Sequence, residues 1–396
     1  MTPEALYASP NALAPHYRRF RVAERLLLTG HSHQAWPDRG FDGQQQAWLD
    51  AAEHVDDKWE RAFAQADAVR RGFARLLDDA GGNIALGAST HELVVRFLSA
   101  LPLRRRPRLV TTDGEFHTIR RQLDRLAEEG VEVVKVAALP AATAAERMAR
   151  AVDDRTAAVL VSAVLYENAH IVPDLGTLLT ACRQAGAELL VDAYHALNVV
   201  PCSLVAERLD GAFVVGGGYK YCQLGEGNCF LRVPAGCALR PAITGWFSEF
   251  EALSDTTEAG RVSYGAGPAR FAGATYDPTS HYRAAAVFAF FEQHGLTPAL
   301  LRHVSQHQVG RLAERFDALA LDPAVVTRDR TVPLTAIGGF LALRAPHAAE
   351  LARRLRDRGV VADFRGDVLR LGPAPYLSDG QLDAAVARLA QAVHQL

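Results

Sequence analysis

Between residues 108 and 215 the chain alternates short apolar runs with longer segments of helical length. The apolar runs occupy 108–112, 131–136, 157–162, 187–191 and 211–215, and the longer segments occupy 119–129, 142–152 and 175–185. Parallel neighbours in a sheet can be joined only by a long crossover connection, usually a helix. The alternation therefore predicts an α/β fold whose large domain has a mainly parallel, doubly wound sheet.

Polar and aromatic residues follow these runs at the end where such sheets bind ligands. The carboxyl ends of parallel strands meet at one edge, and the ligand crevice lies outside that edge. The residues expected there are Phe116, Tyr166, Asp192, His195 and Lys220. Their shared position predicts a single functional site.

Lys220 is the residue among these that most strongly indicates chemistry. It stands between two tyrosines and behind three glycines, in a chain with three lysines and forty arginines. Lys58 and Lys135 fall in a charged helical segment and at a strand end, as surface lysines do. An amine can lose its proton and act as a nucleophile, whereas a guanidinium cannot. The alternative is that Lys220 is a third surface lysine. A GC-rich genome also explains an excess of arginine over lysine.

The Asp192-x-x-His195 sequence upstream of this lysine indicates pyridoxal 5'-phosphate (PLP). In PLP sites a lysine amine forms an imine with the cofactor, and a carboxylate pairs with the pyridinium nitrogen. Asp192 suits the carboxylate, and His195 can hold it or lie against the cofactor. An aspartate at a strand end can also bind a metal or a nucleotide. No second acidic or histidine cluster accompanies it, so no metal is expected.

A second segment suits the cofactor phosphate. Ser89, Thr90 and His91 precede an amphipathic helix expected at 92–101. Free backbone N–H groups and the helix dipole attract anions at such a terminus. A plain N-cap is the alternative for the two hydroxyl residues. The turn that holds Phe116 and Thr118 lies at the end of the next strand.

The length of 396 residues suggests two or three domains. Prolines interrupt an N-terminal arm, residues 1–40, in which His31 and His33 are expected as surface or pocket-rim residues. The large PLP-binding domain is expected over 41–289, and a smaller α+β domain, packed with the arm, over 290–396. Further expectations are helical periodicity over 41–79, a sheet-closing strand at 228–233, a mobile loop at 250–268, strands at 334–337 and 340–343, and helices at 298–319, 346–358 and 379–396.

Composition excludes several kinds of partner. The net charge of −2 shows no basic excess, so no nucleic-acid partner is expected. No apolar run approaches the ~18 residues that a membrane helix needs. The five cysteines are odd in number and form no Cys-x-x-Cys pair. Reduced thiols in a cytoplasmic protein are therefore expected.

From about residue 80 onward the chain resembles a known family. The segments that carry the likeness are Ser89-Thr90, Phe116, Asp192-x-x-His195, Gly218-Tyr219-Lys220-Tyr221, Gly245-Trp246-Phe247, Arg270-Phe271-x-x-Ala274-Thr275, Arg358-Gly359-Val360-x-x-Asp363-Phe364-Arg365 and Leu369-Arg370-Leu371-Gly372-Pro373. They resemble the class V aminotransferase family of fold-type I PLP enzymes, and within it the bacterial kynureninases.

The resemblance implies a role for each matching residue. Lys220 holds PLP and moves the Cα proton, Asp192 pairs with the pyridinium nitrogen, and Tyr166 faces the cofactor as a third catalytic residue. The other implied cofactor contacts are Ser89, Thr90, His91, Phe116, Thr118, His195, Tyr219, Trp246 and, from a second subunit, Thr275. The implied substrate contacts are Arg370 on the α-carboxylate, Trp246 on the side chain, and His31 and Ser32. Such enzymes are homodimers with shared active sites.

Two segments depart from the family pattern. The family's Gly-Asn-Ser-Leu-Gly is Gly30-His31-Ser32-His33-Gln34 here, and its Trp-Phe-Gly-His is Trp246-Phe247-Ser248-Glu249. The first expectation is hydrolytic Cβ–Cγ cleavage of kynurenine or 3-hydroxykynurenine to an anthranilate and alanine, a step of tryptophan catabolism. A class V aminotransferase or β-lyase acting on another amino acid is the alternative. A non-catalytic binding protein is a third hypothesis, against which the intact Lys220, Asp192 and Arg370 argue.

Overall fold

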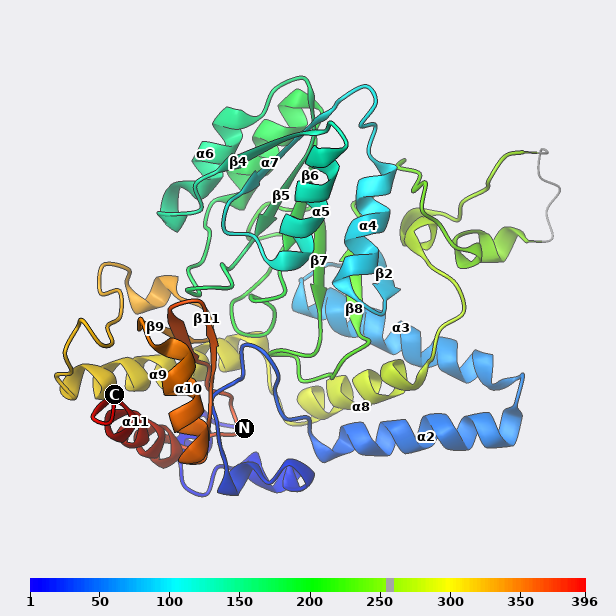
Figure 1. Ribbon diagram of the computed structural model, residues 1–396. Coiled ribbons are helices and arrows are strands. Elements are labelled where there is room, and N and C mark those ends of the chain that lie inside the picture. Colours follow the sequence, from blue (N-terminus) through cyan, green and yellow to red (C-terminus); the bar gives the residue numbers. More distant parts are fainter. Residues whose placement is uncertain (254–259) are drawn as a thin grey trace.

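The computed structural model describes residues 1–253 and 260–396 (Figure 1). An upper part contains a large sheet with helices on both sides, and a lower part contains the remaining helices and two small sheets. Both ends of the chain lie in the lower part. The loop predicted over 250–268 includes residues 254–259, which lie outside the described residues.

The large sheet has seven strands in the order β2-β8-β7-β6-β5-β3-β4. Their bounds are β2 Ile84–Gly87, β3 Arg108–Thr112, β4 Glu132–Val136, β5 Thr156–Ser162, β6 Glu188–Asp192, β7 Phe213–Gly217 and β8 Cys229–Arg232. From β7 to β4 all neighbours are parallel. The predicted mainly parallel sheet is confirmed, and the strands predicted between 108 and 215 each lie within two residues of their expected bounds.

The expectation that a strand at 228–233 closes the sheet is wrong. Strand β8 runs antiparallel to both β7 and β2, so it lies second from the edge. The edge strand is β2, which comes much earlier in the chain. It pairs with the side of β8 that would otherwise expose a row of free N–H and C=O groups.

Helices cover both faces of this sheet. They are α4 Thr90–Ala100 and α5 His117–Glu128 on one face, and α6 Ala144–Ala151 and α7 Leu175–Ala185 on the other (Figure 1). On β5, Ala158 and Leu160 belong to the core beneath α4 and α5, while Val159 and Val161 belong to the core beneath α6 and α7. Successive side chains of a strand point to opposite faces. A strand with helices packed on both faces therefore needs apolar residues at every position, which explains the continuous apolar run.

The helical periodicity over 41–79 is divided between two helices, α2 Asp38–His54 and α3 Lys58–Leu76. The break falls at Val55, whose φ of 48° cannot continue a helix. Both helices pack against α8 Thr279–Gln293, which runs through the boundary expected at 289/290. A Cβ at Gly43 would lie 2.5 Å from the Tyr282 carbonyl oxygen, so α2 approaches α8 this closely only with glycine there.

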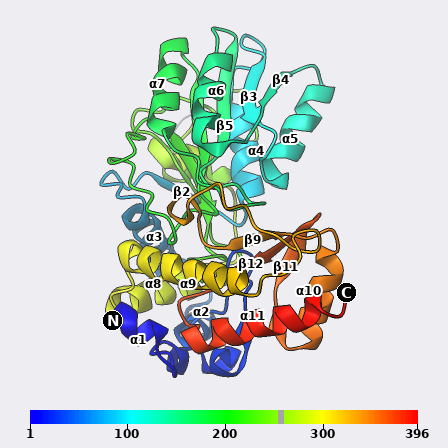
Figure 2. The ribbon, with the colours of Figure 1, turned by 90° about the vertical axis from the view of Figure 1, so that its left-hand side faces the viewer.

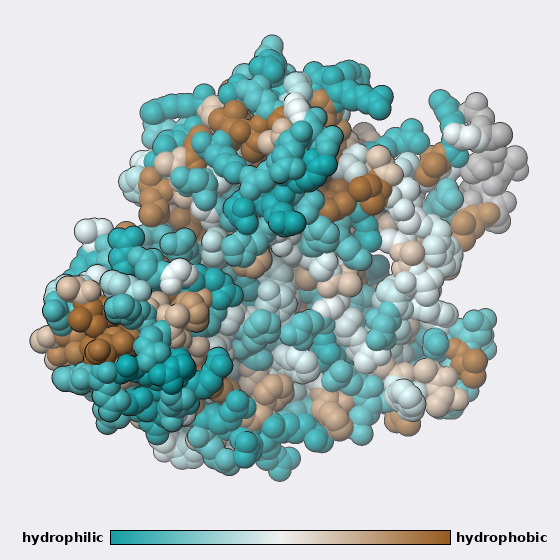
Figure 3. Space-filling view, viewed as in Figure 1, coloured by the Kyte–Doolittle hydropathy of each residue, from teal (hydrophilic) through white to brown (hydrophobic). Residues whose placement is uncertain are grey.

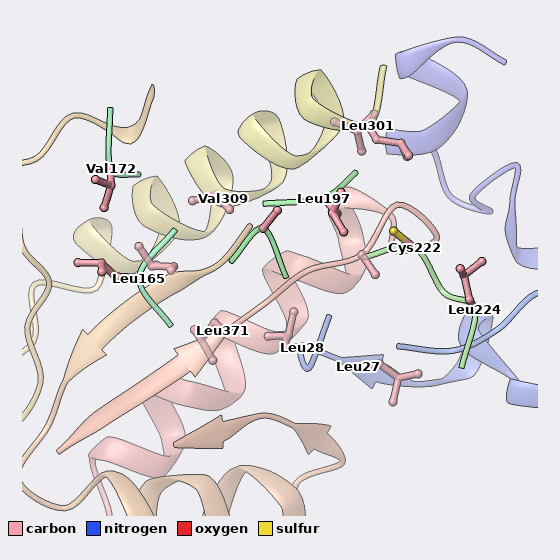
Figure 4. Packing of buried hydrophobic residues seen from close by; sticks show 14 of the residues in the cluster. Leu27, Leu28, Leu165, Val172, Leu197, Cys222, Leu224, Leu301, Val309 and Leu371 are labelled. Carbon is pink, nitrogen blue, oxygen red and sulfur yellow. The ribbon is translucent and has the colours of Figure 1, made fainter. Parts of the chain in front are cut away.

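The lower part joins the two ends of the chain. Its elements are α1 Pro3–Tyr7, β1 Leu26–Leu27, α9 Pro298–Ala318, β9 Leu341–Arg344, α10 Ala348–Asp357, β10 Val360–Val361, β11 Asp363–Arg365, β12 Val368–Leu371 and α11 Asp379–Val393. Strands β11, β12 and β9 form an antiparallel sheet below the large one (Figure 2), and β1 pairs in parallel with β10. Leu27, Leu28 and Leu371 share one buried cluster with Leu224 and Leu301 (Figure 4).

One local prediction in this part is wrong. The strand expected at 334–337 is a 3₁₀ helix, Leu334–Ala336, with Pro333 as its N-cap. The helix predicted at 346–358 is confirmed as α10, which begins at Ala348 because His347 has the non-helical backbone of an N-cap. The helices predicted at 298–319 and 379–396 are confirmed.

The surface seen in Figure 3 is mostly hydrophilic with separate hydrophobic patches. Among the helices of the described ranges, none combines the length and the apolar character needed to cross a bilayer. All five cysteines are free thiols.

Candidate active site

Lys220 lies in the turn after β7 and is 5% exposed. Its Nζ is hydrogen-bonded to His195 Nε2 at 2.5 Å. Burial lowers the pKa of Lys220 well below the ordinary lysine value, and the nearby Asp192 charge opposes this only in part. The amine therefore releases its proton readily and can act as a nucleophile or a base.

The glycine run before Lys220 is explained by close packing. A Cβ at Gly217 would lie 2.5 Å from the Tyr194 ring, and a Cβ at Gly218 would lie 2.5 Å from the Leu224 side chain. Only glycine allows the end of β7 to pass beneath these side chains. The glycine run positions Lys220, because it lets the backbone at the end of β7 lie directly against the side chains of Tyr194 and Leu224.

Asp192 comes from the neighbouring strand β6, and His195 comes from the turn that follows this strand. Asp192 ends this strand, and its Oδ1 accepts a hydrogen bond from the Tyr194 N–H at 2.8 Å. Burial raises the pKa of Asp192, and that hydrogen bond and the Lys220 charge counteract the rise. A buried carboxylate of this kind is stabilised by a cation placed against it.

Eight of the residues predicted to contact the cofactor line one cavity of about 330 Å³. They are Ser89, Thr90, His91, Phe116, Thr118, Asp192, Tyr219 and Lys220. Helix α4 begins at this cavity, and Ser89 is its N-cap, with Oγ accepting from the Glu92 N–H at 3.3 Å. The N-cap alternative is thus correct for Ser89, and the same terminus still offers an anion site at the cavity wall.

Aromatic rings surround the lysine amine. The Nζ atom lies 4.8 Å from the ring centroid of Tyr194, 5.2 Å from that of Phe116 and 5.8 Å from that of Tyr219. Phe116 packs edge-to-face against Tyr166, with centroids 5.3 Å apart. Tyr166 therefore lies behind Phe116 beside the cavity.

Arg370 reaches the same region from β12. Its side chain is 3% exposed, and Nε and Nη2 donate to the two carboxylate oxygens of Asp363 at 2.9 and 2.6 Å. The Nη1 atom donates to the Tyr166 carbonyl oxygen at 2.7 Å. Asp363 lies directly opposite Arg370 in the β11–β12 pair, so the hairpin itself aligns this buried ion pair.

The surface or rim position expected for His31 is wrong. His31 is fully buried, and its Nε2 lies 2.7 Å from Asp363 Oδ1. Burial lowers the pKa of His31 to about 4, so the neutral ring donates its Nε2–H to this carboxylate. His33 is exposed as expected. The Ser32 hydroxyl donates to the Thr29 carbonyl oxygen.

Two predicted residues are not brought to Lys220 within one chain. Trp246 is 45% exposed and packs on Phe247 and Phe250. Thr275 lines a separate groove of about 900 Å³ that adjoins the Lys220 cavity at Ala88 and Gly227. Their assignment to cofactor and substrate stays a prediction.

Sequence reasoning missed Glu115 and Asp363. Glu115 is buried beside Phe116 and accepts hydrogen bonds from the hydroxyls of Thr112 and Ser162, both at 2.6 Å. Burial raises the pKa of Glu115 to about 7. The signal for Glu115 is its place directly before Phe116 in the sequence. The signal for Asp363 is that it lies seven residues before Arg370, in a segment that carries the family resemblance.

Comparisons with known proteins agree with this geometry. Residues 302–389 match the kynureninase C-terminal domain family. The uncharacterized aminotransferase YcbU of Bacillus subtilis is 22% identical over 352 residues, 87% of this chain and 88% of that protein. Kynureninases of Burkholderia mallei and Burkholderia pseudomallei are 28% identical over 57% of this chain, and the match spans 53% of their length.

The solved structures that share this fold include the cystine C-S lyase C-DES and cysteine desulfurases. One is a C-DES mutant with glycine covalently linked to its PLP cofactor, with a TM-score of 0.81, 15% identity, and coverage of 95% of this chain and 98% of that chain. Another is the cysteine desulfurase CsdA of Escherichia coli, with a TM-score of 0.79, 17% identity, and coverage of 100% and 99%.

The likeness to these structures shows that the chain shares their fold along nearly its whole length. Over residues 302–389 the chain is similar to the kynureninase C-terminal domain family, and over most of its length it is similar to an aminotransferase. The family match includes β9, α10 and the hairpin that holds Asp363 and Arg370.

Proposed function

We propose that this protein is a PLP-dependent enzyme that hydrolyses the Cβ–Cγ bond of kynurenine or 3-hydroxykynurenine, giving alanine and an anthranilate. The observation that carries the proposal is Lys220, a buried amine of lowered pKa beside Asp192 and His195. Arg370, which belongs to the segment that matches the kynureninase family, donates to the backbone of Tyr166 beside this cluster. The free cysteines suit a cytoplasmic location.

The residues around Lys220 fit PLP in charge and in shape. Asp192 offers a buried carboxylate for the pyridinium nitrogen, and Phe116 offers an aromatic face for the ring. The start of α4, with Ser89 and Thr90, offers N–H and hydroxyl groups to the phosphate. The cavity of about 330 Å³ has the size of a small-molecule site.

Bound PLP supplies an electron sink for the bond that breaks at the substrate Cα. The protein supplies proton transfer and orientation. Lys220 Nζ takes the proton from Cα, which its lowered pKa permits near neutral pH. The fixed N–H groups of Arg370 orient the substrate α-carboxylate beside Tyr166.

A homodimer with shared sites is part of this proposal. The groove of about 900 Å³ holds Thr275 next to the Lys220 cavity but outside it. A second copy seated on this groove would bring its own Thr275 and Trp246 towards the first copy's cavity. The exposure of Trp246 in the single chain supports such an arrangement.

The direct test is product formation by the PLP-loaded protein. Incubation with kynurenine or 3-hydroxykynurenine is expected to release alanine and the matching anthranilate in equal amounts. Lys220→Ala is expected to abolish turnover, whereas Lys58→Ala, at a partly exposed helix start, serves as a matched lysine control. Absence of alanine from both substrates would exclude this reaction.

A class V aminotransferase or β-lyase acting on another amino acid is the second candidate. It is favoured by His31 and Ser248-Glu249, which differ from the kynureninase pattern, and by the match to an aminotransferase along most of the chain. A panel of amino-acid donors distinguishes the two. Conversion of the bound cofactor to its amine form with release of a keto acid would support transamination, and release of pyruvate and ammonia would support β-elimination.

A further inference from the structure

We propose that Arg365 is a substrate-binding residue whose guanidinium supplies the positive charge for the substrate carboxylate. Arg370, held by Asp363, supplies fixed hydrogen-bond donors to the same carboxylate. This inference rests on the proposed function and assigns a residue beyond those already described.

The β11–β12 hairpin places the three side chains on one face. Asp363 and Arg365 are two residues apart on β11, so their side chains point to the same side. Arg370 lies opposite Asp363 on β12 and shares that side. Arg370 donates to the Tyr166 carbonyl oxygen at 2.7 Å, and Tyr166 packs on Phe116, which lines the Lys220 cavity, so this face lies beside that cavity.

The charge of Arg370 is already balanced within the protein. Asp363 accepts two hydrogen bonds from Arg370 and one from His31. Burial would raise the pKa of Asp363, but these hydrogen bonds and the Arg370 charge hold it well below its usual range. Asp363 therefore stays ionised, and the buried pair has no net charge to offer an incoming anion.

Arg365 has a much weaker partner. Its Nη1 lies 3.8 Å from Asp363 Oδ2, outside hydrogen-bond distance, and donates to the neighbouring Phe364 carbonyl oxygen. The side chain is 46% exposed. Its charge nevertheless acts on the site, because it contributes to lowering the pKa of both Lys220 and His195.

The charged groups around Lys220 differ in how closely they are paired. Two acids and two arginines act on this amine, namely Asp192, Asp363, Arg370 and Arg365. Bound PLP would place its pyridinium nitrogen against Asp192, and Asp363 is already matched by Arg370. Arg365 is the cation of this set with only a long ion pair, and an amino-acid substrate would bring one carboxylate to match it.

Equilibrium binding to the PLP-loaded protein tests this inference. The change in visible absorbance is titrated with alanine and with ethylamine, which has the same amine and methyl group but no carboxylate. Arg365→Gln is expected to raise the apparent dissociation constant for alanine about tenfold, the size of a charge-assisted hydrogen bond, and to leave that for ethylamine within about twofold. Arg365→Lys is expected to recover part of the loss, because it restores the charge without the fork.

Arg344→Gln is the matched control. Arg344 lies on β9 of the same sheet, is 74% exposed and pairs with Asp367; its replacement is expected to leave both dissociation constants unchanged. Equal weakening of alanine and ethylamine by Arg365→Gln, or no weakening of either, would overturn the inference while PLP binding stands. A wild-type protein that takes up no PLP would instead overturn the proposed function.

Discussion

Replacement of Asp363 by asparagine isolates the buried ion pair beneath the candidate substrate site. The change keeps the size of the side chain and removes the charge that Arg370, 3% exposed, faces at 2.6 and 2.9 Å. Removing one partner of a buried pair costs about 3–5 kcal/mol, because the other charge stays buried without compensation. Asp363 is itself 19% exposed, so the loss is expected at the lower end, about 3 kcal/mol.

The assay is urea unfolding followed by circular dichroism at pH 7 and at lower pH. The pKa of Asp363 is lower in the folded protein than its unfolded value of about 3.9. Its contribution to the free energy of unfolding is therefore complete above that pH and is lost as the pH falls through the folded-state pKa. The difference between wild type and Asp363→Asn should shrink accordingly below about pH 4.

Two further variants make this prediction refutable. Asp367→Asn removes an exposed pair with Arg344 on the neighbouring strand and is expected to cost less than about 1 kcal/mol. The double variant Asp363→Asn/Arg370→Gln is expected to be more stable than the sum of its single changes implies, because no buried charge is left alone. A cost for Asp363→Asn equal to that of Asp367→Asn, or additive single changes, would refute the reasoning.

Three other predictions concern Glu115, Lys220 and Gly217. Glu115 has a folded-state pKa of about 7, above its unfolded value, so the free energy of unfolding falls as the pH rises from about 4.5 to 7. Glu115→Gln should reduce this fall, measured by urea unfolding, by up to about 3 kcal/mol. An unchanged pH dependence would contradict the prediction. Nitrogen NMR of the three lysines should show Lys220 titrating below the usual value of about 10.4, and still lower in Asp192→Asn because the Asp192 charge raises its pKa. Gly217→Ala places a Cβ 2.5 Å from the Tyr194 ring and should lower the free energy of unfolding by about 2 kcal/mol, whereas Gly310→Ala, which has nothing within 4 Å, should not lower it.

The parallel sheet and the cluster of Lys220, Asp192 and His195 were predictable from the sequence. Short apolar runs with helical spacers define the strands locally, and the carboxyl ends of parallel strands then have to meet. The position of β8 was not predictable, since its pairing with β2 depends on which edge is left open. The break at Val55 was also missed, because helical periodicity alone does not show where a helix turns back.

The contact between His31 and Asp363 joins residues 332 positions apart. No local pattern connects them, so the sequence predicts a surface or pocket-rim position for His31 and gives Asp363 no role of its own. Strand ends are recognised from their immediate neighbours, whereas this contact follows from the pairing of β1 with β10.

The meeting of residues 28–31 with residues 361–372 has a consequence for biosynthesis. The Leu28 N–H donates to the Val361 carbonyl oxygen, and the Gly30 N–H donates to the Gly372 carbonyl oxygen. The backbone next to Arg370 is therefore hydrogen-bonded in this way only when both segments are present. All strands of the large sheet, and Lys220, precede residue 233 and leave the ribosome well before residues 361–372. The hairpin that holds Arg370 can join residues 28–31 only after those last residues have emerged.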